Sequence, residues 1–89
     1  MLDIKTLTSA ADGFMRATGI SKDVTLSYRI FADSNRLTSL RNGGEITVGR
    51  FHMAMMWLAK HWPDGHALPE ALESYRAALA ADGDEGAAA

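Results

Sequence analysis

The sequence predicts an all-α fold, a compact domain of five helices. Apolar residues recur at three- and four-residue steps along most of the chain, as in amphipathic helices, and no segment shows the two-residue alternation of a strand. Capping residues, glycines and prolines divide this pattern into five segments. At 89 residues the chain can bury one small hydrophobic core but is too short for several domains. We therefore expect one domain over residues 1–81 and a disordered tail over residues 82–89.

The first helix is expected over residues 4–17. Its apolar residues share one face of the predicted helix: Ile4, Leu7, Ala11 and Phe14. Gly19 is well placed to end it, because glycine adopts the left-handed C-cap conformation without steric cost.

The second helix is expected over about residues 22–31. Ser21 offers an N-cap oxygen, and Asp23 places a carboxylate in the first turn, where the helix dipole favours negative charge. Two neighbouring apolar stripes run along this segment, one formed by Val24, Tyr28 and Phe31, the other by Leu26 and Ile30.

The third helix is expected over residues 34–42, in an unusually polar segment. Asp33 and Ser34 are N-cap residue types, and Asn-Gly-Gly at 42–44 is a strong stop signal. A helix of about two turns is marginal alone and must be fixed by tertiary packing. The leucines of this segment are therefore expected to be buried, and its arginines exposed.

The fourth helix is expected to begin after Thr47, a suitable N-cap, and to end before Pro63. Its apolar stripe consists of Val48, Phe51, Met55 and Leu58. Trp57 and Trp62 are predicted to lie in the core and at its edge.

The last helix is expected to open at Pro69 and to end near Gly83. Its apolar stripe consists of Leu68, Leu72, Tyr75 and Leu79. This stripe either covers the helical bundle or pairs with its twin in a second copy of the chain. The acidic and alanine-rich segment that follows has no side chain suited to burial, so it is predicted to be disordered.

Composition limits the classes of function. There is no cysteine, which excludes disulfide scaffolds and thiol catalysis and suits the cytoplasm, where we expect the protein to act. No apolar run approaches the roughly 18 residues of a membrane span, so no membrane partner is expected. The net charge of −2 is uneven, because residues 1–62 hold eight basic and five acidic residues whereas residues 63–89 hold one and six. A positive face toward a polyanion is compatible with this distribution.

The segment from Phe31 to Gly43 reads FADSNRLTSLRNG. It follows the layout of a turn, a helix cap, outward polar residues, two inward aliphatic residues and a terminal Asn-Gly. Leu26-Ser27, in the preceding helix, places a small residue where two helices would cross closely. With the apolar helix that follows, this pattern resembles the helix-turn-helix of the phage repressor and Cro family over about residues 14–62. At the family's turn glycine this chain has Phe31 or Ala32.

The resemblance implies a lambda-repressor-like fold and a sequence-specific, DNA-binding regulator of transcription, from a mobile element or its host. The recognition helix, residues 34–42, would enter the major groove of duplex DNA. The side chains implied in reading base edges are Ser34, Asn35, Arg36, Thr38 and Ser39. Arginine can bridge guanine O6 and N7, and asparagine adenine N6 and N7. The side chains implied in contacting the DNA backbone are Lys22, Arg41, Asn42 and Arg50.

A homodimer is also expected, because one short recognition helix reads few base pairs and proteins of this pattern usually bind two half-sites. The predicted dimer surface is Trp62, Leu68, Leu72, Tyr75 and Leu79. A competing interpretation keeps the fold but makes the chain a protein-protein interaction module, an adaptor or antiactivator that binds no DNA. The polar third helix would then be a solubilising surface.

We expect neither catalysis nor a cofactor. The serines occupy positions that helix capping explains, and no paired carboxylates are predicted on one face. The histidines at 52, 61 and 66 are interpreted as surface or interface residues, not metal ligands, and the methionines as core filling.

Overall fold

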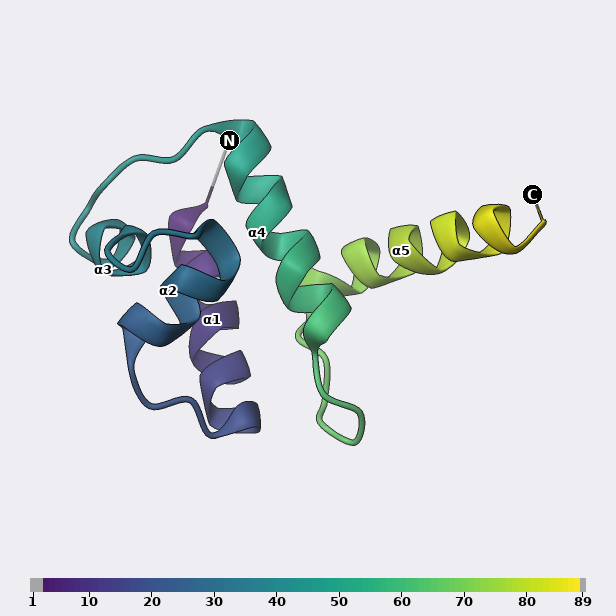
Figure 1. The fold of residues 1–89 in the computed structure, drawn as a ribbon, viewed down its shortest axis with the longest axis horizontal. Helices are drawn as coiled ribbons and strands as arrows, with labels where there is room; N and C mark the ends of the chain where they lie inside the picture. Colours follow the sequence, from purple (N-terminus) through teal and green to yellow (C-terminus); the bar gives the residue numbers. More distant parts are fainter. Residues whose placement is uncertain (1–2, 89) are drawn as a thin grey trace.

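In a computed structural model of the chain, which describes residues 3–88 and side chains through Ala80, the protein is all-helical (Figure 1). The helices are α1 (Ile4–Thr18), α2 (Asp23–Phe31), α3 (Arg36–Arg41), α4 (Val48–His61) and α5 (Glu70–Ala88). The described part contains no strand, so the predicted all-α fold with five helices is confirmed. None of the helices described here is long and apolar enough to cross a membrane.

Local capping explains several helix ends. Asp3 caps α1, because its carboxylate accepts a hydrogen bond from the Lys5 N–H at 3.0 Å. Gly19 ends α1 in the left-handed conformation, with φ 79°, as predicted. Thr47 caps α4 through a 3.2 Å hydrogen bond from the Arg50 N–H, also as predicted. These ends were predictable because each depends on residues close in sequence.

The start of α2 differs from the prediction. The helix begins at Asp23 after an extended Lys22, and no side chain caps it. Ser21 is exposed and does not cap α2, so the first N–H groups of the helix are left to hydrogen-bond with water.

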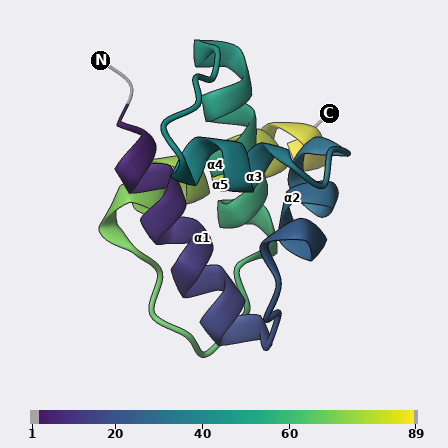
Figure 2. The same cartoon turned by 90° about the vertical axis from the view of Figure 1, so that its left-hand side faces the viewer.

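A single core joins the helices. α1 packs against α3, α4 and the start of α5, while α2 packs against α3 and α4 (Figures 1 and 2). The largest fully buried side chains come from every helix: Leu7, Leu26, Leu37, Met55, Leu58 and Leu72. Burial of each such side chain contributes about 1.5–3 kcal/mol before entropy is subtracted.

An aromatic cluster closes one end of this core. The ring of Phe14 meets Trp57 edge-on with centroids 5.4 Å apart, and Trp62 in the same manner at 5.7 Å. Such pairs add about 0.5–1.5 kcal/mol to the area they bury. Trp62 is buried and Trp57 is partly buried, so both belong to the core or its edge as predicted, but in the opposite order.

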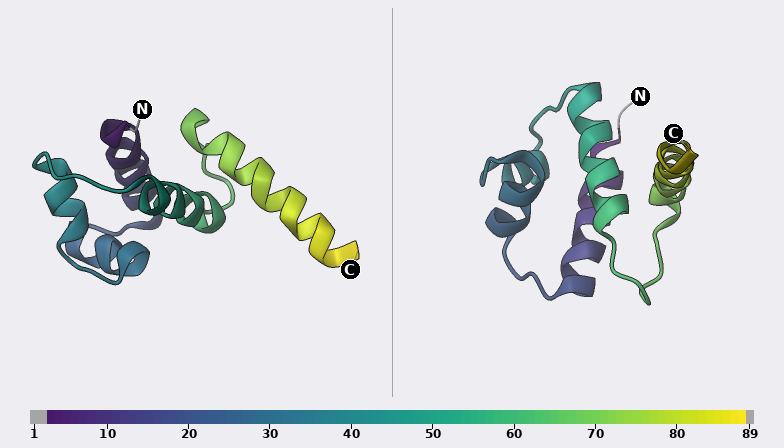
Figure 3. Two further views of the ribbon diagram at one scale, coloured as in Figure 1. Left: turned by 90° about the horizontal axis from the view of Figure 1, so that it is seen from above. Right: turned by 45° about the vertical axis from the view of Figure 1, so that its right-hand side comes forward.

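α5 leaves the body of the protein. Its first turns dock on α4, where Arg76 donates a 2.9 Å hydrogen bond to the carbonyl of Ala59, whereas its second half projects away (Figures 1 and 3). The sequence predicts a disordered tail from residue 82, whereas the helical backbone continues to Ala88. Alanine is the strongest helix former and favours this continuation, whereas Gly83 and Gly86 each cost about 1 kcal/mol within a helix.

Candidate nucleic-acid interface

The connection from α2 to α3 is built on one unusual backbone conformation. Ala32 has φ 56° and ψ 26°, and among the residues described it is the only non-glycine with positive φ. Its N–H donates to the carbonyl of Tyr28 at 2.8 Å, which ends α2. A left-handed conformation costs an alanine about 1–2 kcal/mol. Of the two residues that could occupy the turn position, the structure therefore identifies Ala32.

Asp33 sets the start of α3. Its carboxylate accepts a 2.9 Å hydrogen bond from the N–H of Asn35, two residues ahead, which makes an Asx turn instead of a helix N-cap. The regular helix then begins at Arg36 and ends at Arg41, shorter than the predicted 34–42 at both ends. Asp33 was expected to be able to cap the helix, but its carboxylate accepts a hydrogen bond within the preceding turn instead.

Ser27 locks α3 onto α2. Its side chain is fully buried, and its hydroxyl accepts a 2.9 Å hydrogen bond from the N–H of Leu37 and donates one of 2.5 Å to the carbonyl of Asp33. The sequence predicted only that a small residue at this position allows close helix crossing. The hydroxyl does more, because it satisfies a buried amide of α3 that has no other partner.

The inward side of α3 agrees with the sequence. Leu37 is 1% exposed and Leu40 is 3% exposed, so their predicted burial is confirmed. The end of the helix is closed by Gly44, whose N–H donates to the carbonyl of Ser39 at 2.8 Å. A Cβ at Gly44 would lie only 2.7 Å from that carbonyl oxygen, so the close approach requires glycine.

The outward side of α3 carries most of the predicted base-reading residues. Four of them are exposed on the turn and the helix: Ser34, Asn35, Thr38 and Ser39. Arg36 is half-buried, contrary to the expected exposure, and its Nε atom is enclosed with no hydrogen-bond partner. Arg36 also borders an open groove whose other lining residues belong to the segment that leads into α4 and to the first turn of α4.

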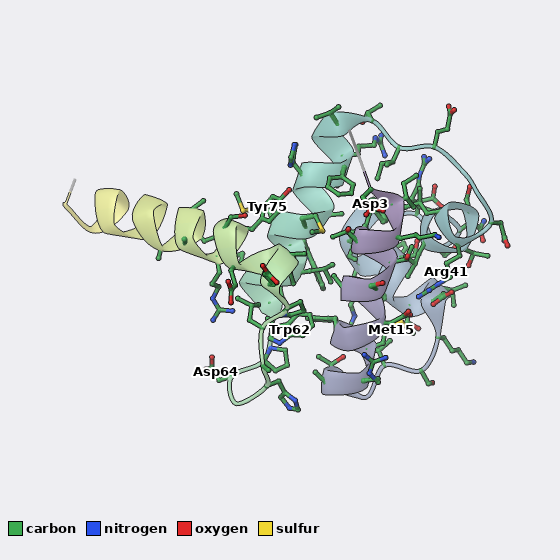
Figure 4. All side chains as sticks on the ribbon, turned by 180° about the vertical axis from the view of Figure 1, so that it is seen from behind. Asp3, Met15, Arg41, Trp62, Asp64 and Tyr75 are labelled. Carbon is green, nitrogen blue, oxygen red and sulfur yellow. The ribbon has the colours of Figure 1, made fainter. Side chains whose placement is uncertain are left out.

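Arg41 is engaged within the protein. Its Nη2 lies 2.6 Å from Asp12 of α1 and its Nε 2.8 Å from Asp23 of α2 (Figure 4). The guanidinium side chain is 27% exposed, and the hydrogen bond to Asp12, followed by that to Asp23, raises its pKa. Arg41 is exposed as a residue, as predicted, but two carboxylates already occupy its donors. Its contact to the DNA backbone stays a prediction, which these ion pairs disfavour.

The remaining predicted backbone-contact residues are free of such pairs. Lys22, Asn42 and Arg50 are exposed, and none of them takes part in an ion pair within the described part of the chain. They come from three segments that border α3: the start of α2, the end of α3 and the start of α4. An open groove of about 300 Å³ separates α3 from the start of α4 and is lined by Arg36, Glu45, Ile46, Thr47 and Arg50.

The predicted dimer surface is only partly at the surface. Trp62 is 6% exposed and Leu72 is fully buried, so both pack inside the chain's own core. Contrary to the prediction, neither side chain is available for a dimer contact. Leu68, Tyr75 and Leu79 are half-buried. Tyr75 is held by a 2.7 Å hydrogen bond between its hydroxyl and Nδ1 of His52 on α4. Figure 4 shows Tyr75 and Trp62 at different places along the α4–α5 junction.

Val24 and Tyr28 form an apolar pair on α2 whose exposure was not predicted from the sequence. Tyr28 is 64% exposed and Val24 is 44% exposed, one helical turn apart. The helix instead buries Leu26, Ile30 and Phe31. Two adjacent apolar stripes were readable in this segment, but only packing against α3 and α4 decides which one turns inward.

The described residues contain no group of three or more histidine, cysteine, aspartate or glutamate side chains that could hold a metal ion. His61 stacks on Trp57 with ring centroids 4.3 Å apart. Partial burial lowers the pKa of His61, and the neighbouring charge of Lys60 lowers it further.

Comparison of the chain with family models, curated proteins and solved structures gave no match.

Proposed function

We propose that this protein is a sequence-specific regulator of transcription that binds duplex DNA, with α2 and α3 acting as a helix-turn-helix. The observation that carries the proposal is the pairing of α2 with α3 through Ser27, which fixes a short helix whose outer side is a row of hydrogen-bonding side chains. Such a helix is narrow enough to lie in the major groove, where each base pair presents a distinct pattern of donors and acceptors.

The residues at the start of this unit suit base reading. Asn35 is exposed at the N-cap of α3, and its amide can pair with the N6 and N7 of adenine. Thr38 and Ser39 add short hydroxyls one turn further along the helix. Of these three residues, Asn35 lies at the N-terminal end of α3, the end that typically approaches the bases.

The exposed cations near α3 suit contacts to phosphates. Lys22 lies at the start of α2 and Arg50 in the first turn of α4, so they flank the recognition helix on two elements. Phosphate contacts supply affinity and register without reading sequence. We assign Lys22 and Arg50 to the DNA backbone, and leave Arg41 to its structural role.

The experiment is selection of bound duplexes from a random pool, followed by titrations on the best site and on random DNA. Asn35→Ala should reduce the preference for the best site by roughly 1–3 kcal/mol and leave random-sequence binding unchanged. Lys22→Ala should weaken both and make the salt dependence shallower. Lys60→Ala, at the far end of α4, is the matched charge control. Indifference of the wild-type chain to duplex DNA at low salt would refute the proposal.

We propose that the regulator acts as a homodimer that joins two half-sites, with contacts from α5. Tyr75 and Leu79 are partly exposed on the first turns of α5, where the helix packs on the core and Tyr75 is hydrogen-bonded to His52 of α4. Leu79→Asp should then reduce the dimer fraction in light scattering and weaken binding to a two-half-site duplex more than to a single half-site. A wild-type monomer at all micromolar concentrations would contradict this part alone.

A second candidate function, a protein-binding module, has its own supporting observation. Val24 and Tyr28 form an exposed apolar pair on α2, and aromatic residues are enriched at protein interfaces. The capture of Arg41 by two carboxylates also reduces the positive charge that a polyanion would meet. Absence of DNA binding at low salt, with Tyr28 required for binding of a protein partner, would favour this candidate.

A further inference from the structure

We propose that the groove between α3 and α4, the Arg36–Arg50 groove, binds one phosphodiester of the DNA backbone. This inference rests on the proposed DNA-binding function and changes the role of Arg36 from reading a base to holding a phosphate. The groove is open, has a volume of about 300 Å³ and is lined by Arg36, Glu45, Ile46, Thr47 and Arg50.

Arg36 is the first reason. Its Nε atom is enclosed and has no hydrogen-bond partner, and no carboxylate of the described residues forms an ion pair with it. The enclosed Nε has no access to the groove, so an oxyanion there would meet the two Nη groups, which are not among the enclosed unpaired atoms. Arg41, five residues further on, has carboxylates on both Nε and Nη2. The same fold thus contains one arginine with oxyanion partners and one without.

The opposite wall of the groove supplies further donors. Arg50 is exposed, borders the groove from the first turn of α4 and has no ion-pair partner among the described residues. The Thr47 hydroxyl oxygen accepts the Arg50 N–H, which leaves its own O–H free to donate. Residues that carry two guanidinium groups and a hydroxyl therefore border one space from two segments, and arginine forks match the geometry of phosphate oxygens.

Glu45 limits the affinity of the groove for anions. Its carboxylate borders the same groove without an ion pair to either arginine, so it offsets part of the attraction of the two guanidinium groups. A free phosphate held by this groove alone should therefore bind weakly. A phosphate of the DNA backbone is also held in place by the other contacts of the duplex, which raises its effective concentration at the groove.

The position of the groove also fits a backbone contact. Arg36 follows Asn35, the exposed residue at the start of α3, so a phosphate held in the groove would lie beside the polar side of the helix. Contacts of this kind fix the register of a recognition helix along the duplex.

The test is fluorescence anisotropy on a labelled duplex across a salt series. Arg36→Gln and Arg50→Gln should each make the slope of log K against log salt shallower, and the double variant should lower it by about 0.9, the value for the one phosphate contact that they share. Arg36→Lys should retain most of the slope, because it keeps the charge. Glu45→Gln should tighten binding, and Lys60→Gln is the control. Thermal melts of each variant verify folding.

A second arm separates the two sources of phosphate. Inorganic phosphate, titrated against the wild-type chain, should shift the backbone amides of Thr47 and Arg50 only weakly in NMR spectra. DNA binding with unchanged salt slopes in both Arg36→Gln and Arg50→Gln overturns the groove and leaves the proposed function standing. Absence of any DNA binding overturns the proposed function and the phosphodiester occupant. In that case, saturable shifts of the Thr47 and Arg50 amides on addition of inorganic phosphate would still support an oxyanion site in the groove. The absence of such shifts would overturn the site as well.

Discussion

Replacement of Ser27 by alanine tests how α3 is held in place. The hydroxyl of Ser27 is the acceptor for the buried N–H of Leu37 at 2.9 Å, and alanine removes it without adding volume. A buried amide left without a partner costs about 1–3 kcal/mol. The carbonyl of Asp33 also loses its donor, but that hydrogen bond is only partly buried and contributes less. For a chain of this size a loss of 2 kcal/mol lowers Tm by about 8–16 °C.

Urea denaturation and thermal melts give this loss directly, and hydrogen exchange locates it. The amide of Leu37 should exchange much faster in Ser27→Ala than in the wild type, because its protecting acceptor is gone. Ser21→Ala is the matched control, since Ser21 is exposed and precedes α2, and it should change stability by less than about 0.5 kcal/mol. If Ser27→Ala matches this control and Leu37 stays protected, the hydroxyl does not hold α3.

Three further outcomes are expected. Leu40→Ala should lower the free energy of unfolding by about 2–5 kcal/mol in urea titrations, because it opens a cavity at a residue only 3% exposed. Ala32→Gly should raise the free energy of unfolding by up to about 1 kcal/mol. Glycine relieves the strain of the left-handed conformation at φ 56°, and this relief exceeds the entropy that glycine adds to the unfolded chain. A lower free energy of unfolding in Ala32→Gly would contradict the left-handed conformation. An NMR titration should place the pKa of His61 below its ordinary 6.5, and Lys60→Gln should restore only a small part of the shift, because burial is its main cause. On acidification the unfolded chain binds a proton at His61 before the folded chain does, which lowers the free energy of unfolding. The stability that depends on neutral His61 is therefore complete above about pH 6.5 and is lost as the pH falls through the lowered pKa. Thermal melts of wild type and His61→Gln across this pH range would detect the loss.

Much of the helical pattern was readable because its causes are local. Gly19 ends α1 and Thr47 begins α4, each through a hydrogen bond with a residue at most four positions away. The burial of Leu37 and Leu40 followed from the polarity of their neighbours, since a two-turn helix needs an anchor. Periodicity and capping sufficed for these elements.

The candidate site was less readable because it depends on distant contacts. The partners of Arg41 lie 18 and 29 residues away, so its type and neighbours suggested a free cation. On α2, the outward turn of Tyr28 reflects packing against α3 and α4, and no pattern within the helix selects between its two apolar stripes. The burial of Leu72 likewise required knowing where α5 docks.

The capture of Arg41 joins three helices at one point, because the last residue of α3 contacts Asp12 of α1 and Asp23 of α2. All three side chains are partly exposed, so dissolved ions screen both contacts. If the protein binds DNA as proposed, added salt would therefore act twice: it would compete for the phosphates, and it would loosen the C-terminal end of α3 on its neighbours.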